Sequence, residues 1–208
     1  MQNTDRLCMG CMNDNGGEQV CPICGYDEQS LHPDSALPPR SWLGGDRYLV
    51  GKVLDTNGEG VTYLGWDNEN DSIVWIREYF PAGLCERTPE GAVRKLEGSE
   101  FPFEEGMLAF LELNNAIARL RELPALLPVV DIFEAGGTAY CVEQAASGIT
   151  LREFLLRNGG TLKWEQARPL FLPLLSALKA LHNAGIVHRG ISPDTLLVGR
   201  DGKIRLKD

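Results

Sequence analysis

The stretch Leu181-His-Asn-Ala-Gly-Ile-Val-His-Arg-Gly-Ile-Ser-Pro-Asp-Thr-Leu-Leu-Val198 determines how the second half of the chain is interpreted. Its first residues end a helix that we expect near Glu165–Asn183, and two internal prolines should bend that helix. Its last residues, Thr195–Val198, are expected to form a strand that pairs with Lys203–Leu206 across an Arg-Asp-Gly turn. The polar segment between helix and strand is therefore expected to be a loop.

Three strands are expected much earlier in the chain. Residues 47–54, 61–66 and 72–77 are rich in β-branched and aromatic residues and alternate in polarity. The loop Asp55-Thr-Asn-Gly-Glu-Gly60 joins the first two, and the polar turn Asp67–Asp71 joins the next pair. This order predicts an antiparallel meander and argues against the βαβ unit of a dinucleotide-binding fold.

Helical and extended segments fill the middle of the chain. Apolar residues recur with a helical period over residues 103–123, and Pro124 ends that pattern. Two further strands are expected at 129–134 and 138–143. The capping box Thr150-Leu-Arg-Glu153 opens a short helix that a pair of glycines closes. The sequence thus predicts an α+β protein.

Taken together, these blocks resemble bacterial eukaryotic-like Ser/Thr protein kinases that carry an N-terminal zinc ribbon. The resemblance is carried by Gly60-Val-Thr-Tyr-Leu-Gly65, by Ile76-Arg-Glu-Tyr-Phe-Pro81 and by the stretch 181–198. It implies a kinase-like N-lobe at 42–144, made of an antiparallel sheet and a helix. It also implies the first part of a helical C-lobe at 145–208, ending at the Asp of the Asp-Phe-Gly position.

The catalytic loop departs from the pattern of that family. His188 and Arg189 match it, and they are expected to be structural supports. The resemblance places the aspartate that accepts the substrate proton at Gly190, the phosphate-contacting lysine at Ser192, and the asparagine that holds a second Mg²⁺ at Thr195. Positioned acid–base groups typically contribute ~10²–10⁴ in rate. No catalytic residue of this loop is intact, which predicts an impaired kinase, that is, a pseudokinase.

The phosphate-binding loop is also altered. The three glycine positions of the family fall at Asp55, Asn57 and Gly60, and only the last is kept. A polar hairpin tip without a ligand is the simpler interpretation of this loop, so ATP and Mg²⁺ are expected to bind weakly if they bind. The residues that the resemblance implies for a nucleotide site are Gly58, Gly60, Val61, Arg77, Glu143, Ala145 and Asp208.

Charged positions around that site differ as well. Arg77 replaces the third-strand lysine, and a planar guanidinium does not substitute freely for a compact ammonium. The helical glutamate that would pair with it falls at Leu113, and Glu112 lies about 100° away around the helix. Glu143 occupies a position beside the adenine pocket, where an ionised carboxylate is costly unless it is paired, for example with Arg77.

Four of the six cysteines form two pairs near the N-terminus, Cys8-Met-Gly-Cys11 and Cys21-Pro-Ile-Cys24. Two such knuckles supply four thiolates to one tetrahedral Zn²⁺, and a site closed by four cysteines stabilises structure rather than catalysing a reaction. Redox-active dithiols are the alternative. Gly25 supplies the tight turn that follows the second knuckle. Cys85 and Cys141 are expected to be small buried residues.

Charge and hydropathy exclude several classes of function. The 208 residues carry a formal net charge of −9, and residues 1–40 contain six acidic side chains against two arginines. This balance argues against nucleic acid as a partner, because phosphate binding requires clustered lysine and arginine. No apolar run approaches the ~20 residues of a membrane span, and a secretory signal is not recognisable. We therefore expect a cytoplasmic protein.

The expected organisation is a zinc ribbon at 1–27, a Pro-rich linker at 28–41 and the two kinase-like parts described above. The leading functional hypothesis is a pseudokinase that acts as a signalling scaffold or weak nucleotide binder with a protein partner. One alternative is an active Ser/Thr kinase that uses MgATP with unorthodox chemistry. Another is that the ribbon is the working part, as a protein-docking module. The sequence leaves the oligomeric state open.

Overall fold

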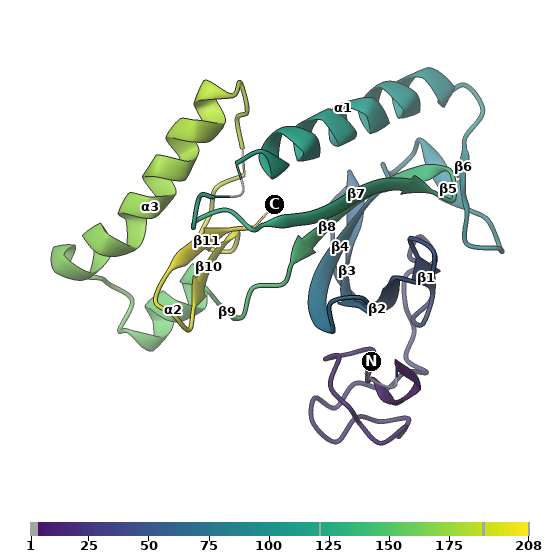
Figure 1. Cartoon of the computed structure of the whole chain (residues 1–208), viewed down its shortest axis with the longest axis horizontal. Helices are drawn as coiled ribbons and strands as arrows, with labels where there is room; N and C mark the ends of the chain where they lie inside the picture. Colours follow the sequence, from purple (N-terminus) through teal and green to yellow (C-terminus); the bar gives the residue numbers. More distant parts are fainter. Residues whose placement is uncertain (1–3, 121, 189, 208) are drawn as a thin grey trace. The chain divides into compact units, whose positions relative to one another are not determined.

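The computed structural model describes residues 4–120, 122–188 and 190–207. The chain divides into two compact units, shown with their elements labelled in Figure 1. We call Met1–Glu112 with Val130–Glu143 the sheet unit, and Leu113–Val129 with Gln144–Asp208 the helical unit. Arg189 and Asp208, two of the residues implied by the kinase resemblance, lie outside the described residues.

The sheet unit is built on one six-stranded sheet in the order β1-β2-β3-β4-β8-β7. Its strands are β1 (Trp42–Leu43), β2 (Tyr48–Thr56), β3 (Gly60–Asp67), β4 (Ser72–Tyr79), β7 (Val129–Ala135) and β8 (Thr138–Gln144). Strands β2, β3 and β4 pair antiparallel in sequence order, which confirms the predicted meander. The predicted strands at 129–134 and 138–143 are also confirmed, as β7 and β8.

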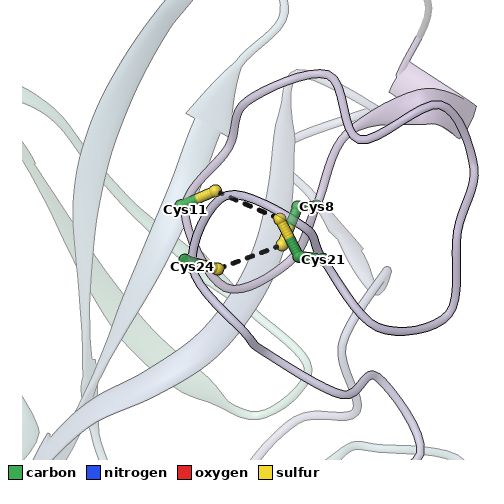
Figure 2. A group of neighbouring side chains, drawn as sticks. All are labelled: Cys8, Cys11, Cys21 and Cys24. Atoms are coloured by element: carbon green, nitrogen blue, oxygen red, sulfur yellow. Dashed lines mark hydrogen bonds between the residues drawn. The ribbon is translucent and has the colours of Figure 1, made fainter.

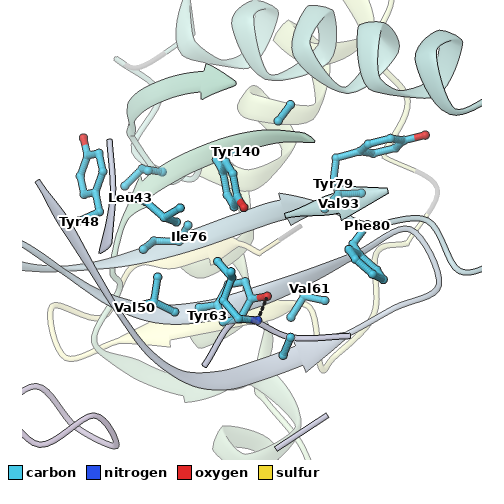
Figure 3. Packing of buried hydrophobic residues seen from close by; sticks show 14 of the residues in the cluster. Leu43, Tyr48, Val50, Val61, Tyr63, Ile76, Tyr79, Phe80, Val93 and Tyr140 are labelled. Atoms are coloured by element: carbon cyan, nitrogen blue, oxygen red, sulfur yellow. Dashed lines mark hydrogen bonds between the residues drawn. The ribbon is translucent and has the colours of Figure 1, made fainter. Parts of the chain in front are cut away.

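Side chains of β3 alternate between two buried faces of the sheet. Val61 and Tyr63 belong to the main core, whereas Leu64 and Trp66 belong to a second apolar cluster. Figure 3 shows the main core, where Tyr63, Ile76 and other side chains from neighbouring strands pack together. Because successive residues of a strand point to opposite faces, a strand buried on both faces reads as a nearly continuous apolar run.

Helix α1 (Glu100–Ala118) packs on the main core through Phe103, Met107 and Phe110. The ring of Phe103 lies 5.2 Å from that of Tyr79, between centroids. Gly106 permits the close approach of this tyrosine, since a Cβ there would lie 2.1 Å from its hydroxyl oxygen. The helix predicted over 103–123 therefore begins three residues earlier and ends five residues earlier than expected.

A short hairpin that the sequence analysis did not identify follows β4. It consists of β5 (Cys85–Arg87) and β6 (Val93–Lys95), paired antiparallel. These strands are three residues long, which is too short to give a clear period-2 pattern. The hairpin brings Arg87 next to the core of the sheet, as described below.

The segment expected to be a linker, 28–41, has neither helix nor strand but is packed against the sheet. Ala36 and Leu37 are buried in the main core. The backbone N–H of Leu37 donates a hydrogen bond of 3.0 Å to the Tyr63 hydroxyl. The segment thus contributes to the core in addition to connecting the cysteine knuckles to β1.

The helical unit contains α2 (Leu151–Arg157), α3 (Trp164–Asn183) and a three-stranded sheet in the order β11-β10-β9, formed by β9 (Gly148–Thr150), β10 (Leu196–Gly199) and β11 (Ile204–Leu206). Thr150 caps α2 by accepting the N–H of Glu153 at 3.1 Å, which confirms it as the predicted N-cap. The predicted hairpin is present as β10 and β11, whereas β9 was not predicted. Among the described residues, no helix has the length and hydropathy needed to cross a bilayer.

Candidate functional site

The two cysteine knuckles come together in the structure (Figure 2). The sulfur atoms of Cys8, Cys11, Cys21 and Cys24 all lie within 4.8 Å of one another. The sulfurs of Cys8 and Cys24 are 3.6 Å apart, and those of Cys11 and Cys21 are 3.9 Å apart. Four sulfurs at tetrahedral corners about 2.3 Å from one ion would be ~3.8 Å apart, so the spacing fits a four-thiolate metal site. It is too long for disulfides, whose sulfurs are bonded at about 2.05 Å.

Backbone turns set the positions of these thiols. The N–H of Met12 bonds the Cys8 carbonyl at 2.8 Å, and the N–H of Gly25 bonds that of Cys21 at 2.8 Å. Gly25 has φ of +71°, the left-handed conformation expected of it from the sequence. The N–H of Gly10 donates to the sulfur of Cys8 at 3.2 Å, a contact that favours its thiolate form.

The thiols differ in how readily they ionise. Burial raises the pKa of Cys8 to about 12. Burial also disfavours the thiolate of Cys21, but bonds from the backbone N–H groups of Cys24 and Ile23 outweigh it and lower the pKa to about 7. A cation that binds all four thiolates must displace protons, so its affinity will rise with pH.

The phosphate-loop position of the kinase resemblance is a closed hairpin tip in the structure. The side-chain oxygen of Asn57 accepts the backbone N–H groups of Glu59 at 3.2 Å and Gly60 at 3.0 Å. The carboxylate of Asp55 accepts the N–H of Thr56 at 3.0 Å. A kinase uses such N–H groups to bind phosphates, but here side chains of the loop already occupy them.

The retained glycine of this loop has a packing role. A Cβ on Gly60 would lie 2.3 Å from the carbonyl oxygen of Glu78 on the paired strand β4. The tip is also tied to the segment after β4, since the carbonyls of Glu59 and Gly58 accept the N–H groups of Phe80 and Ala82. Close packing against β4 is therefore a sufficient reason for a glycine at position 60, without a bound phosphate.

The other residues implied for a nucleotide site are distributed over both units. Val61 is buried in the main core, and Arg77 lies half-buried on β4. Burial raises the pKa of the Cys141 thiol, Glu143 raises it further and Arg77 lowers it, so both charges act on the same buried group. Ala145 belongs to the helical unit.

Burial of Cys85 and Cys141 is confirmed, since both are at most 7% exposed. Burial raises the pKa of Cys85 to about 11. A thiol that remains protonated at neutral pH is a poor nucleophile, and this fits the expectation that both cysteines pack as small apolar residues.

The helix position expected to supply an acidic partner for the third-strand cation is exposed. Leu113 is 41% exposed, and its neighbour Glu112 is exposed as well. The buried side chain at this level of α1 is Asn114, at 1% exposure. The sequence analysis did not single out this residue, because an asparagine within an amphipathic helix gives no clear signal for burial.

The catalytic-loop position in the helical unit is stabilised by its own side chains. The Thr195 hydroxyl lies 2.9 Å from the Gly190 carbonyl, to which it donates, and accepts the Ser192 N–H at 2.9 Å. The N–H of Gly190 in turn donates to Nδ1 of His188 at 3.2 Å. The loop is thus a self-bonded turn, and the Thr195 hydroxyl stabilises it through bonds to two of its backbone groups.

Asp194 is the carboxylate of this turn, and it is already paired. Its two oxygens accept hydrogen bonds of 2.7 Å from Nε and a terminal nitrogen of Arg152 at the start of α2. The arginine lowers the pKa of this carboxyl below its usual range. A carboxylate in a bidentate pair with a depressed pKa is a weak proton acceptor, so Asp194 is poorly suited to act as a general base.

A buried charged network lies on β4, beside the Arg77 position. The Glu78 carboxylate accepts hydrogen bonds from the hydroxyls of Tyr63 at 2.6 Å and Tyr140 at 2.8 Å, and from Arg87 at 2.6 Å. Arg87 also donates to the Ser35 carbonyl at 2.8 Å. The sequence analysis missed this network because its members come from five separate segments of the chain.

Comparisons with known proteins agree with the fold. No protein-family model matches the chain. The Ser/Thr-protein kinase PknL of Mycobacterium tuberculosis is 30% identical over 82% of this chain and 38% of its own length. Sperm motility kinase 2B of Mus musculus is 36% identical over 41% of this chain and 17% of its own length. The chain therefore spans less than two fifths of these curated relatives.

A solved structure, the apo form of PpkA-294, superimposes with a TM-score of 0.70 at 28% sequence identity. The match covers 84% of this chain and 61% of the other. Together with the antiparallel sheet and its helix, these likenesses support a kinase-like domain similar to bacterial Ser/Thr protein kinases.

Proposed function

We propose that this chain belongs to a catalytically impaired kinase-like protein, a pseudokinase, that works in the cytoplasm as a signalling scaffold for a protein partner. The observation that carries the proposal is the turn at Gly190–Thr195. A kinase needs a carboxylate there to accept the hydroxyl proton and an amide to bind Mg²⁺. Gly190 has no side chain, and the Thr195 hydroxyl is used within the turn.

Nucleotide binding is expected to be weak in the same protein. The N–H groups of the hairpin tip bond to Asn57, and the carboxylates of Asp55 and Glu59 lie at the same tip. Two unit charges ~5 Å apart repel by about 3 kcal/mol at an effective dielectric constant of ~20, before screening. Phosphates would therefore have to compete with the side chain of Asn57 and approach negative charge.

The cysteine site is proposed to hold one structural Zn²⁺. Four cysteine sulfurs within 4.8 Å of one another are the donor set and the spacing that this ion prefers. When bound, Zn²⁺ would supply only crosslinking of the two knuckles, because four thiolates leave no position open for a substrate. Cysteine pairs that bind a metal ion instead of forming disulfides are typical of a reducing compartment, which fits a cytoplasmic location.

Phosphoryl transfer from radiolabelled ATP to the chain itself and to a mixed protein substrate tests the proposal, using a protein that contains the whole chain. We expect no transfer above a heat-denatured control. The double variant Gly190→Asp/Thr195→Asn should remain inactive, since the hairpin tip is unchanged. Variant Ser176→Ala, on the exposed face of α3, is the control for the effects of expressing and purifying a substituted protein.

Transfer by the unaltered protein would overturn the pseudokinase proposal and favour the alternative, an active Ser/Thr kinase. Full activity in the double variant alone would show instead that the nucleotide site is sound. A thermal-shift titration with ATP, with and without Mg²⁺, distinguishes a pseudokinase that binds nucleotide from a scaffold that does not. No shift at millimolar nucleotide would limit the protein to a scaffold role.

A further inference from the structure

The second face of the six-stranded sheet is covered by the cysteine knuckles. Met9 and Met12, which directly follow the metal-site residues Cys8 and Cys11, are at most 2% exposed and pack in one cluster with Leu64 and Trp66. The cluster also contains Leu49 of β2 and Leu7, which follows the N-terminal turn. The knuckles therefore shield apolar side chains of β2 and β3 from solvent.

The pairing of β2 with β3 is irregular at the point where the first knuckle contacts β2. Its register with β3 shifts between Val50 and Val53, so the residues between them lie outside the regular ladder. The N–H of Lys52, within this irregularity, donates instead to the carbonyl of Met9 at 2.8 Å. Gly51 makes the approach possible, because a Cβ there would lie 2.3 Å from Cε of Met12.

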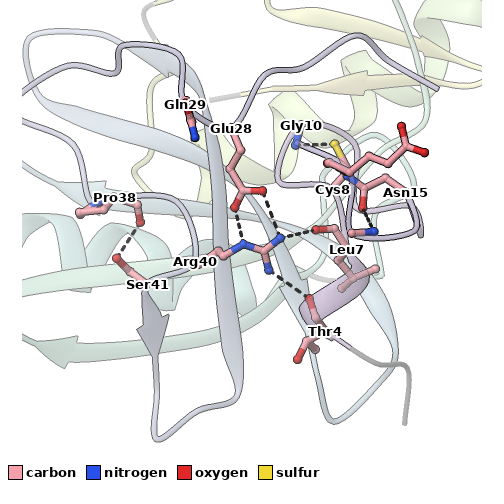
Figure 4. A network of polar contacts seen from close by, with 12 residues as sticks. Thr4, Leu7, Cys8, Gly10, Asn15, Glu28, Gln29, Pro38, Arg40 and Ser41 are labelled. Carbon is pink, nitrogen blue, oxygen red and sulfur yellow. Dashed lines mark hydrogen bonds and ion pairs between the residues drawn. The ribbon is translucent and has the colours of Figure 1, made fainter. Parts of the chain in front are cut away.

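A second attachment is made by Arg40 (Figure 4). Its guanidinium forms two bonds with Glu28, just after the second knuckle, and donates to the Leu7 carbonyl at 3.1 Å. Its backbone N–H donates to the carbonyl of Val50 on β2 at 2.8 Å. One residue thus joins both ends of the cysteine module to the sheet strand.

The candidate metal ligands of the first knuckle alternate along the chain with the residues that contact the sheet. Cys8 and Cys11 enclose Met9, so the position of the Met9 carbonyl depends on both sulfurs being held together. So small a module has too little apolar core to fold without its ion. Removal of the ion should therefore break the hydrogen bond from the Lys52 N–H to the Met9 carbonyl and expose the side chain of Leu64 to solvent.

We propose that occupancy of the four-cysteine site by Zn²⁺ controls the order of the β2–β3 hairpin, and with it the tip at 57–59. The site is then a metal-dependent regulatory element of the kinase-like sheet. This inference rests on the proposed metal site but not on whether the protein transfers phosphate. By thermodynamic reciprocity, a change on the sheet side of the contact must also change the affinity for Zn²⁺.

Hydrogen exchange measured by mass spectrometry on the whole chain, with Zn²⁺ and after chelation under reducing conditions, provides the first test. We expect the β2–β3 peptides to exchange at least about tenfold faster without metal, equivalent to ~1.4 kcal/mol of local stability. Peptides of α3 serve as an internal control and should not change. Unchanged exchange in β2–β3 after loss of one Zn²⁺ per chain, or no Zn²⁺ binding at all, would overturn the proposal.

Variants on the sheet provide the second test, because they leave all four cysteines intact. Leu64→Ala, at a residue 8% exposed in the contact, should weaken Zn²⁺ binding by about fivefold or more in a chelator competition. Leu54→Ala, at a residue 37% exposed on β2, is the matched control and should bind Zn²⁺ as the unaltered chain does. Equal affinities for the two variants would contradict the coupling.

Variants on the knuckles complete the experiment. Met12→Ala should reduce both Zn²⁺ affinity and the protection that Zn²⁺ confers on β2–β3. Ile23→Ala, at a residue 62% exposed in the second knuckle, should alter neither. If the Met12 variant behaves like the Ile23 variant in both measurements, the knuckle does not transmit metal occupancy to the sheet.

Discussion

Replacement of Arg87 by methionine tests whether the buried acid on β4 depends on its arginine. The Glu78 side chain is 0% exposed and that of Arg87 is 5% exposed, with 2.6 Å between the paired oxygen and nitrogen. Methionine retains much of the apolar stem that packs near Phe80, whose ring centroid lies 4.8 Å from the guanidinium carbon. The substitution therefore removes charge and hydrogen bonds more than volume.

The expected cost follows from the partners that remain. Without Arg87 the carboxylate keeps the hydrogen bonds from the hydroxyls of Tyr63 and Tyr140, and its negative charge stays buried. Removing one member of a buried ion pair typically costs about 3–5 kcal/mol. Arg94→Met provides the control, since the Arg94–Glu86 pair lies on the same hairpin but is 70% and 47% exposed. Exposed pairs contribute about 0–1 kcal/mol.

Urea unfolding followed by tryptophan fluorescence measures both variants, because Trp66 and Trp75 lie in the sheet. We expect a large drop in midpoint for Arg87→Met and little change for Arg94→Met. The double variant Glu78→Gln/Arg87→Met should be less destabilised than Arg87→Met alone, since the buried charge is gone. Equal midpoints for Arg87→Met and Arg94→Met would refute the view that this pair holds the sheet together.

Three smaller changes test other parts of the structure. Gly60→Ala should lower the midpoint of urea unfolding, because its Cβ would clash with the Glu78 carbonyl; an unaltered midpoint would show that the strands adjust. Asp67→Asn should make unfolding less sensitive to acid. Burial opposes the Asp67 charge, but bonds led by that from Arg47 lower its pKa, so its stabilisation is present at neutral pH and is lost as pH falls through the folded-state pKa. A pH profile of melting temperature identical in both proteins would contradict this. Asp194→Ala should leave the melting temperature nearly unchanged, because its pair with Arg152 is 54% and 58% exposed and exposed pairs contribute little; a clear drop would show that this pair stabilises the turn.

Much of the fold could be predicted from local patterns. The meander at 47–77, the strand pair at 129–143 and the Thr150 cap were expected because alternation and capping are properties of neighbouring residues. The pairing of the cysteine knuckles was also predictable, since a two-residue spacer already places two thiols near one ion. The end of α1 at Ala118 was not, because the apolar period continues beyond it.

The candidate site was predicted by residue identity more than by arrangement. The replacements that the kinase resemblance implies at Gly190 and Thr195 can be read from the sequence, because the presence or lack of a carboxylate or amide is a matter of residue identity. That Thr195 bonds within its own turn, and that Asp194 is occupied by Arg152, became apparent only with coordinates. Arg152 lies 42 residues from its partner, and no local pattern relates the two.

The sequence by itself determined the kinase-like order of elements, the four cysteines with the spacing of a metal site, and the residue types at the positions that the kinase resemblance assigns to catalysis, since each depends on the identity and spacing of nearby residues. Only the tertiary structure decided that the cysteine module and the segment at 28–41 pack on the sheet, and that Glu78 is balanced by Arg87. The physical reason is that burial, charge pairing and the acceptor of the Lys52 N–H all depend on contacts between distant segments, which are formed only when the chain folds.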